Sequence, residues 1–533
     1  MNSQQSEVHG KLGTRFIPLP SVVVCLLIAA CSCAVLWVEN GHFTFPVDDP
    51  YIHFALAKNI AHGHYGINPG EFSAPSSSLV WPFLLAPFAT LPFAVAVPVV
   101  FNALCAFATV ALFAAMADGL LVIENARKKR VAVLALSFAF ALATNQIGLA
   151  LLGMEHSLQV LCAVWLMTLV VRDAMPELAR PSSLAIGCSI ALGPLIRYEM
   201  VGPSLLAAAY FVYRGRSSAA LLGLAVAFGG LGLFSYELVA HGQGALPTSV
   251  LAKSGVAPGQ PLWVTALSNV RGQLHAGWAV ILAFLGFGLF LYLARNELQR
   301  HERPLAALLV LTLLGHLLVG RSGWFGRYEA YVLAITYTLG LALFARQISG
   351  WAIQRPPTFK LVGLAVFGLV LSARYAAIAL STPLGALNVY QQQAQVARFV
   401  HDYYRAPVGV NDLGYVAWRS DQYVLDFIGL ASREAFLAQK AHPLDSGAWV
   451  GDLTAEHDVR FAAIYDEWFR HLPATWRRCG WLHLGSKRLT TAGDVVAFYA
   501  LDEATRSSLP PKLHAWATTL PPNVRFEFAD GCR

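Results

Sequence analysis

Residues 45–54, "FPVDDPYIHF", place two adjacent carboxylates, a proline, a tyrosine and a histidine shortly after a long apolar run. That run, at 18–38, is long enough to cross about 30 Å of hydrocarbon as a helix. A charged side chain near the centre of a membrane helix costs up to about 3 kcal/mol. Asp48 and Asp49 therefore mark the point where the chain leaves the lipid, and they suggest a polar site at the membrane boundary.

The composition around this stretch is that of a membrane protein. Of 533 residues, 56% are hydrophobic and only 13% are charged, and the mean hydropathy is +0.53, which excludes an ordinary soluble globular chain. We predict a polytopic α-helical membrane protein with about eleven transmembrane helices. The predicted spans are 18–38, 95–122, 131–147, 156–172, 182–196, 199–213, 217–240, 276–294, 304–320, 328–345 and 360–380.

The basic residues predict the orientation of these spans. If the N-terminus is cytoplasmic, most loop Lys and Arg residues fall on the cytoplasmic side, including "ARKKR" at 126–130, as the positive-inside rule requires. The apolar stretch 79–91 is short and broken by proline, and counting it as a span would place "ARKKR" outside. We therefore predict a re-entrant or juxtamembrane helix there. The expected location is the bacterial inner membrane, with the C-terminal part in the periplasm.

After the last predicted span the long apolar runs end and the sequence reads like that of a soluble domain, which predicts two domains. Residues 1–382 form the expected transmembrane domain, and residues 383–533 form a soluble periplasmic α/β domain. Short strands are predicted in "APVGVNDLGYVAW", "QYVLDFIGL", "RFAAIYDEWF" and "DVVAFYAL", after the helical "NVYQQQAQVARFVHDYY". Asp412 or Asp426, at strand ends, could contact an acceptor or only shape turns.

The first apolar run has a second interpretation. Lys11 and Arg15 precede it, and "IAAC" ending at Cys31 is similar to a lipoprotein cleavage box. Because many further spans follow, we favour a retained membrane anchor.

The cysteines fit the predicted topology. Only Cys479 and Cys532 fall in the predicted exported domain, where oxidation is permitted, so we expect a disulfide between them. The other cysteines fall in predicted spans, and no cysteine spacing is typical of a metal site.

The polar residues at the predicted outer face should share a polar cavity, because unpaired charges beside apolar runs are costly. Each also has a structural interpretation: Asp49 before Pro50 is a good helix start, Arg197 and Glu199 can pair across a helix break, and Lys253 and Arg327 can anchor the interface. The residues are Asp48, Asp49, His53, His62, His64, Glu71, Glu155, His156, Arg197, Glu199, Lys253, Arg321, Arg327 and Glu329.

The first outer loop, "DDPYIHFALAKNIAHGHYGINPGE" at 48–71, resembles that of GT-C glycosyltransferases, most closely the terminal arabinofuranosyltransferase-like branch. The resemblance continues in order through "SSSLVWPFLLAPF", "LGMEHSL", "LIRYEM", "LPTSVLAKSG" and "GRYEAYVL" into "VGVNDLGYVAWRSDQYVLDFIGLAS". The chain departs from that pattern by lacking Gly-Tyr-Thr after the first-loop turn and by having "RYE" where Arg-Pro-Glu is usual. The resemblance implies a GT-C fold and transfer of a sugar, for example a pentofuranose such as arabinose, from a polyprenyl-phosphate donor.

The chemistry implied by the resemblance assigns roles to the polar residues. Asp48 or Asp49 would be the base that takes the acceptor proton, with inversion at the anomeric carbon, and a divalent cation such as Mg²⁺ or Mn²⁺ could bind Asp48, Asp49 and Glu155. The donor phosphate would be bound by Lys253, Arg327, Arg321 and Arg197. The substrate-contacting residues would be Tyr51, His53, Glu155, His156, Glu199 and Tyr328.

The expected partners are a lipid-linked sugar, membrane lipid and a cell-envelope glycan, lipid or protein acceptor, and no nucleic acid. Two other classes stay open. A transporter would be expected to show internal repeats and polar residues at mid-span, and a non-catalytic scaffold would not require the aspartate pair.

Overall fold

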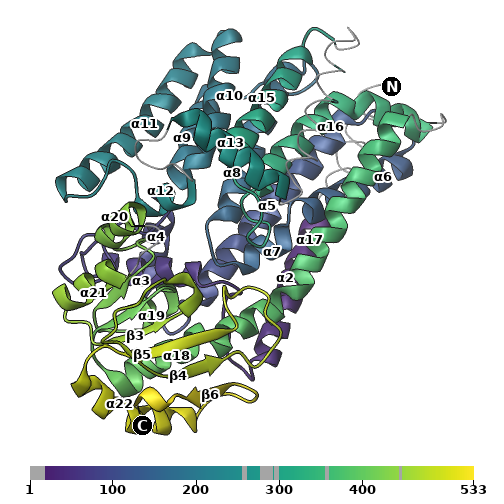
Figure 1. Ribbon diagram of the computed structural model, residues 1–533. Helices are drawn as coiled ribbons and strands as arrows, with labels where there is room; N and C mark the ends of the chain where they lie inside the picture. Colours follow the sequence, from purple (N-terminus) through teal and green to yellow (C-terminus); the bar gives the residue numbers. More distant parts are fainter. Residues whose placement is uncertain are drawn as a thin grey trace.

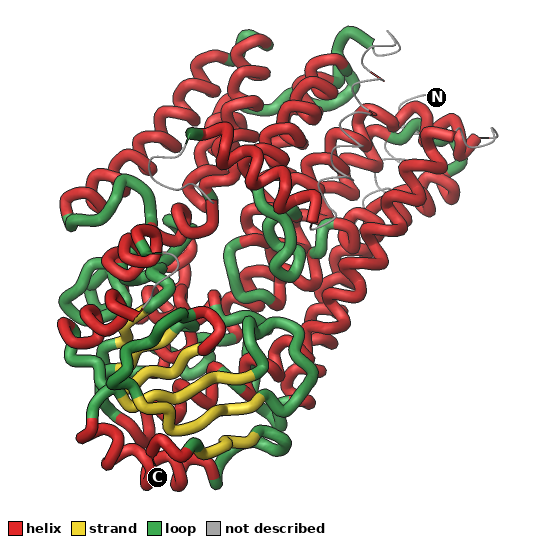
Figure 2. The backbone as a smooth tube through the Cα atoms, viewed as in Figure 1, coloured by secondary structure: helices red, strands yellow, loops and turns green. Residues whose placement is uncertain are grey.

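The computed structural model describes residues 18–254, 261–275, 288, 292, 299–353, 359–442 and 447–532. A bundle of long helices forms one part, and a sheet flanked by helices forms the other (Figures 1 and 2). Helix α17 (Phe359–Gln391) runs from the bundle to the sheet and contains Pro383. It therefore continues past the predicted boundary between residues 382 and 383.

The bundle contains most of the predicted spans as helices, because long apolar runs can satisfy their backbone polar groups in lipid only by internal hydrogen bonds. Its main helices are α2 (Leu19–Val38), α5 (Ala96–Leu120), α6 (Ala126–Ala143), α7 (Gln146–Leu151), α8 (His156–Ala174), α9 (Ser183–Ile196), α10 (Val201–Tyr213), α11 (Ser217–Ala240), α15 (Arg303–Val319), α16 (Ala330–Ile353) and α17. The predicted span 276–294 lies almost wholly outside the described residues.

Five helices within the described residues are long and apolar enough to cross a membrane: α2, α5, α8, α11 and Ala330–Gly350 of α16. This number is smaller than the predicted eleven in part because α9, α10 and α15 are shorter helices and α6 starts in the basic "ARKKR" segment. In the apolar windows of these helices, 78% of residues are buried in α8 but only 22% in α2. Helix α8 therefore lies inside the bundle, and α2 faces outward.

The first outer loop lies between the bundle and the sheet (Figure 1). It contains α3 (Asp49–Ala61), which begins one residue earlier than a cap at Asp49 would place it. The segment predicted to be re-entrant forms the short helix α4 (Trp81–Leu85) and a following single turn, Ala86–Phe88. Two further helices, α12 (Thr248–Ser254) and α13 (Leu262–His275), precede α15.

The C-terminal sheet has six strands in the order β2-β1-β3-β5-β4-β6. Strand β1 (Val408–Val410) is parallel to β2 (Val424–Asp426) and to β3 (Phe461–Ile464). Strand β5 (Val495–Ala500) is antiparallel to β3 and to β4 (Arg477–His483). Strand β4 is also antiparallel to β6 (Arg525–Phe528). All four predicted strand segments contain strands. Strands β4 and β6 were not predicted.

Helices cover both faces of this sheet. The helices of this part are α18 (Gln393–Arg398), α19 (Gly414–Arg419), α20 (Arg433–Ala441), α21 (Gly447–Glu456) and α22 (Glu503–Ala517). Leu509, Leu513 and Trp516 of α22 pack on one face, while Trp449 and Val450 of α21 pack on the other. A disulfide joins Cys479 of β4 to Cys532, with Cα atoms 4.8 Å apart. The result is a three-layer α/β arrangement beneath the bundle.

Candidate active site

Asp48 turns its carboxylate toward the C-terminal domain. Asp48 Oδ2 accepts a hydrogen bond from the N–H of Gly414 at 2.6 Å, and Oδ1 accepts one from Tyr415 at 2.9 Å. It makes no side-chain capping bond to α3, the helix it precedes. Because both oxygens are occupied, the structure gives Asp48 a contact between domains and separates it from its neighbour Asp49.

A second carboxylate, Asp412, lies near Asp48 in the C-terminal domain. Burial raises the pKa of Asp48 well above its ordinary value, and the charge of Asp412 raises it further, against the lowering effect of the two backbone N–H groups. Burial also raises the pKa of Asp412, although hydrogen bonds from Gln393 and Tyr465 lower it. The charge of Asp412 thus disfavours ionisation of Asp48, and the charge of Asp49 disfavours ionisation of Asp412.

Asp49 faces the bundle. Its Oδ2 lies 3.1 Å from Nη2 of Arg327, whose side chain is 2% exposed. The same nitrogen donates to the Tyr328 hydroxyl at 3.0 Å, and Nη1 contacts the sulfur of Met154 at 2.9 Å. A buried guanidinium thus holds the Asp49 carboxylate in one direction and compensates its charge.

The segment Met154–Glu155–His156 connects Asp49 to a second ion-pair network. Glu155 is fully buried and pairs with Arg197, and His53 Nε2 lies 3.4 Å from its other oxygen. Arg197 also makes a two-pronged pair with Glu199, with bonds of 2.6 and 3.0 Å. Arg197 lies between α9 and α10, so the pairing across a helix break is real, and it extends to a third residue.

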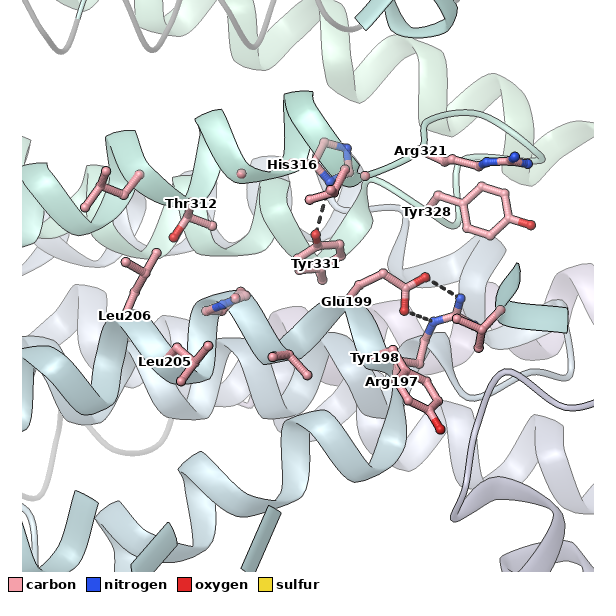
Figure 3. A pocket seen from close by; sticks show the side chains of 18 of the residues that line it. Arg197, Tyr198, Glu199, Leu205, Leu206, Thr312, His316, Arg321, Tyr328 and Tyr331 are labelled. Carbon is pink, nitrogen blue, oxygen red and sulfur yellow. Dashed lines mark hydrogen bonds and ion pairs between the residues drawn. The ribbon is translucent and has the colours of Figure 1, made fainter. Parts of the chain in front are cut away.

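A cavity of about 530 Å³ opens beside this network between α10 and α15. Leu205, Leu206 and Thr312 line one end, while Arg197, Glu199, Arg321 and Tyr328 lie at the other (Figure 3). The lining is therefore apolar along the helices and charged at the end nearest the first outer loop. Asp49 is two hydrogen bonds from this charged end, through Arg327 and Tyr328.

Arg321 lines the cavity and makes only a weak polar contact among the described residues. Its Nη2 lies 3.5 Å from the carbonyl oxygen of Ala252, at the edge of hydrogen-bond range. In the part of the chain that the structure describes, Arg321 has no carboxylate within ion-pair distance, unlike Arg197 and Arg327. Lys253, the next residue after Ala252, lies in α12, and its side chain is outside the described residues. Arg321 is thus available to an anion in the cavity.

Some predicted contact residues do not reach the cavity. Tyr51 is fully buried among aromatic rings, and its hydroxyl accepts the N–H of Phe45, so its predicted substrate contact is replaced by a packing role. His53 and His156 are also buried, the first between Ser76 and Glu155 and the second beside the Tyr328 ring. These two histidines therefore contact residues of the site without lining the cavity.

Several cavity residues were missed from the sequence, and two of them are hydrogen-bonded to each other. His316 of α15 and Tyr331 of α16 line the cavity, and their side chains are hydrogen-bonded at 3.1 Å (Figure 3). A lone histidine in the apolar "LLGHLLV" segment is a recognised signal of an internal polar site. That signal could have identified His316 but not its tyrosine partner.

The predicted metal ligands do not converge. Asp48 is bound by backbone N–H groups, Asp49 by Arg327 and Glu155 by Arg197, so each carboxylate already has its compensating partner. Among the described residues, only Glu434, Glu456 and His457 bring three such ligand atoms within 4.8 Å of one another, and they lie in the C-terminal domain. The expected Asp48, Asp49 and Glu155 site therefore does not fit a cation in this arrangement.

Comparison with known proteins gives a family match only for the C-terminal part. Residues 385–499 match the family described as "Domain of unknown function (DUF8728)". No curated protein sequence matches the chain.

Solved structures similar to this chain include an oligosaccharyltransferase of Archaeoglobus fulgidus in the apo form. The two chains are 12% identical with a TM-score of 0.46, and the match covers 88% of this chain and 74% of that one. The same archaeal enzyme, AglB, with an inhibitory peptide and a dolichol-phosphate has 11% identity, a TM-score of 0.47, and coverage of 92% and 74%. ArnT from Cupriavidus metallidurans bound to undecaprenyl phosphate has 11% identity, a TM-score of 0.47, and coverage of 90% and 98%.

Proposed function

We propose that this protein is a membrane glycosyltransferase of the GT-C type that takes a sugar from a polyprenyl-phosphate donor. The observation that carries the proposal is the cavity between α10 and α15, apolar along its length and cationic at one end, with Asp49 two hydrogen bonds away. An isoprenoid chain fits apolar helix surfaces, and a phosphate fits a guanidinium at their end.

The reaction proposed is a single displacement at the anomeric carbon. The acceptor hydroxyl oxygen forms the new bond, the bond from that carbon to the phosphate oxygen breaks, and Asp49 accepts the hydroxyl proton. A hydroxyl group is a poor nucleophile at neutral pH, so a positioned base is required. Arg327 compensates the charge of Asp49 and fixes the direction of its carboxylate. One displacement inverts the anomeric centre.

The leaving group is the polyprenyl phosphate, whose developing charge needs a cation. Arg321 lines the cavity without a carboxylate partner among the described residues, and we assign it this role. Arg197 is already paired with Glu155 and Glu199, so it shapes the charged end of the cavity. The proposed compartment is the periplasmic side of a bacterial inner membrane, and the proposed sugar class includes pentofuranoses such as arabinose.

The test is transfer from synthetic polyprenyl-phosphate sugars by purified protein. Asp49→Asn should lower kcat at least about 100-fold with donor binding retained, because a positioned base contributes about 10²–10⁴. Arg321→Ala should weaken donor binding and turnover. Lys128→Ala in the first turn of α6 is the charge-removal control and should change neither. Full activity of Asp49→Asn with a donor that the wild type uses would overturn the proposal.

A further inference from the structure

We propose that Asp48 is a positioning residue that docks the C-terminal domain on the first outer loop and thereby aims Asp49 at the active site. This inference rests on the proposed function for its catalytic consequence, but the docking itself is independent of it. It assigns different tasks to two adjacent aspartates that the sequence alone treats as a pair. It also means that the C-terminal domain helps to position the proposed catalytic base.

The hydrogen bonds that Asp48 accepts replace a missing cap on a helix of the C-terminal domain. Helix α19 begins at Gly414, and the residue at its cap position, Leu413, has no side-chain oxygen and makes no capping bond. The first N–H groups of a helix lack partners within it. Asp48, 366 residues away in sequence from Gly414, accepts the N–H of Gly414 and of Tyr415. The carboxylate therefore supplies from another domain what a local Asp or Ser usually supplies.

Other residues of the first loop also contact the C-terminal domain. Asn68 donates to the carbonyl oxygen of Val424 at 3.1 Å and accepts the N–H of the same residue at 2.9 Å. Lys58 pairs with Asp421 at 3.0 Å. Asp48, Lys58 and Asn68 thus contact one continuous region around α19 and the start of β2, which is the pattern of a docking surface.

Aromatic rings fill the space behind these bonds. Tyr51 of α3 lies 4.3 Å from Tyr415 and 5.3 Å from Trp418 between ring centroids, and Phe54 lies 5.5 Å from Trp418. Buried aromatic contacts of this kind stabilise an interface beyond their area alone. Gly414 allows the close approach, because a Cβ there would overlap the Asp48 backbone oxygen and lie 2.7 Å from its Oδ2.

The consequence for Asp49 follows from helix geometry. Successive side chains at the start of a helix point about 100° apart, since a turn contains 3.6 residues. With the Asp48 carboxylate held on α19, the Asp49 side chain is directed to the opposite partner, Arg327. Releasing Asp48 frees the first turn of α3 to rotate and moves the proposed base, and a small misplacement of a catalytic group can cost about 100-fold in rate.

The experiment combines amide hydrogen exchange with kinetics on the full chain. Asp48→Ala should raise exchange of the Gly414 and Tyr415 amides at least about tenfold and lower kcat about 10- to 100-fold. The donor KM should stay within about twofold, because Asp48 does not line the cavity. Asp48→Asn keeps one acceptor oxygen and should recover part of both effects. Asp49→Asn should abolish transfer without changing exchange at α19.

Two further variants keep the test decisive. Gly414→Ala displaces α19 while leaving the Asp48 carboxylate intact, so it should reproduce the kcat loss and add little to Asp48→Ala in the double variant. Lys128→Ala in the first turn of α6 removes a charge outside the docking surface and should change neither readout. If Asp48→Ala leaves the α19 amides protected, the docking role is wrong. If the wild type transfers no sugar, only the proposed function fails, since exchange still decides the docking.

Discussion

Asp426 illustrates how a buried carboxylate can serve only the local turn. It ends β2, is 1% exposed, and accepts N–H groups from Ile428 at 2.9 Å and Ala431 at 2.8 Å. An acceptor sugar would have to compete with these bonds inside the domain. Asp426 is therefore a turn-forming residue, the alternative that its position at a strand end had left open.

Titration of Asp426 predicts a pH-dependent stability. Burial raises the pKa of its carboxyl to about 6, against the lowering effect of backbone hydrogen bonds. The folded state then holds the proton more tightly than the unfolded state, so this contribution is full below about pH 4 and is lost as pH rises through 6. Relative to Asp426→Asn, the wild type should lose at most about 3 kcal/mol between pH 4 and 7.

The measurement is the difference in Tm between the two proteins across this pH range in one detergent. The difference isolates Asp426 because the other titrating groups are common to both. A difference that is constant from pH 4 to 7 would show that Asp426 does not titrate there.

At the scale of elements, α10 and α15 together form the proposed lipid groove. Leu205 and Leu206 of α10 face Thr312 of α15 across the cavity (Figure 3), and Leu311 of α15 also lines it. Both helices are shorter than 18 residues. In the proposed function they offer a surface to the apolar chain of the donor, and burial of that chain is favourable by about 25 cal/mol per Å².

Filling this groove should block the donor. Leu206→Trp places a larger ring in the cavity and should weaken donor binding at least about tenfold, because each isoprene unit excluded forfeits apolar burial. Leu184→Trp on α9 is the matched control, since Leu184 is 78% exposed and does not line the cavity. Equal donor affinity of Leu206→Trp and the wild type, measured by competition with polyprenyl phosphate, would place the lipid elsewhere.

Elements set by local pattern were predictable from the sequence, and those set by distant partners were not. Helices α2, α5 and α8 follow from apolar runs alone. Strand β4 was missed because "RRCGWLH" mixes charge with small residues, and β6 because two of its four residues are charged and it lies at the edge of the sheet. The cluster of Glu155, Arg197 and Arg327 was anticipated as outer-face charges. The hydrogen bond from Gly414 to Asp48 was not anticipated. The local sequence does not show whether a carboxylate caps its own helix or a helix that lies 366 residues away in the chain.

At the scale of the molecule, several connections attach the C-terminal domain to the rest of the protein. Helix α17 connects it covalently, and the bonds of Asp48 and Asn68 dock it on the first outer loop. The edge strand β6 and the final turn, Asp530–Cys532, follow α22 at the far side of the sheet from that docking surface. This segment is held by the pairing of β6 with β4 and by one further restraint.

The Cys479–Cys532 disulfide is that restraint, and it makes the last prediction. The bridge joins β4 to the final turn across 53 residues. A closed loop of this length lowers the entropy of the unfolded chain enough to stabilise the fold by about 4 kcal/mol in the entropic model, and removal of a native bridge commonly costs about 2–5 kcal/mol. Cys532→Ser should therefore lower the free energy of unfolding of the C-terminal domain by about 2–4 kcal/mol. It should also increase proteolysis after β5, while exchange at α19 stays unchanged because the docking surface is remote. Non-reducing peptide mapping of protein from an oxidising compartment provides the direct check. Alkylation of both thiols without reductant would show that the bridge does not form.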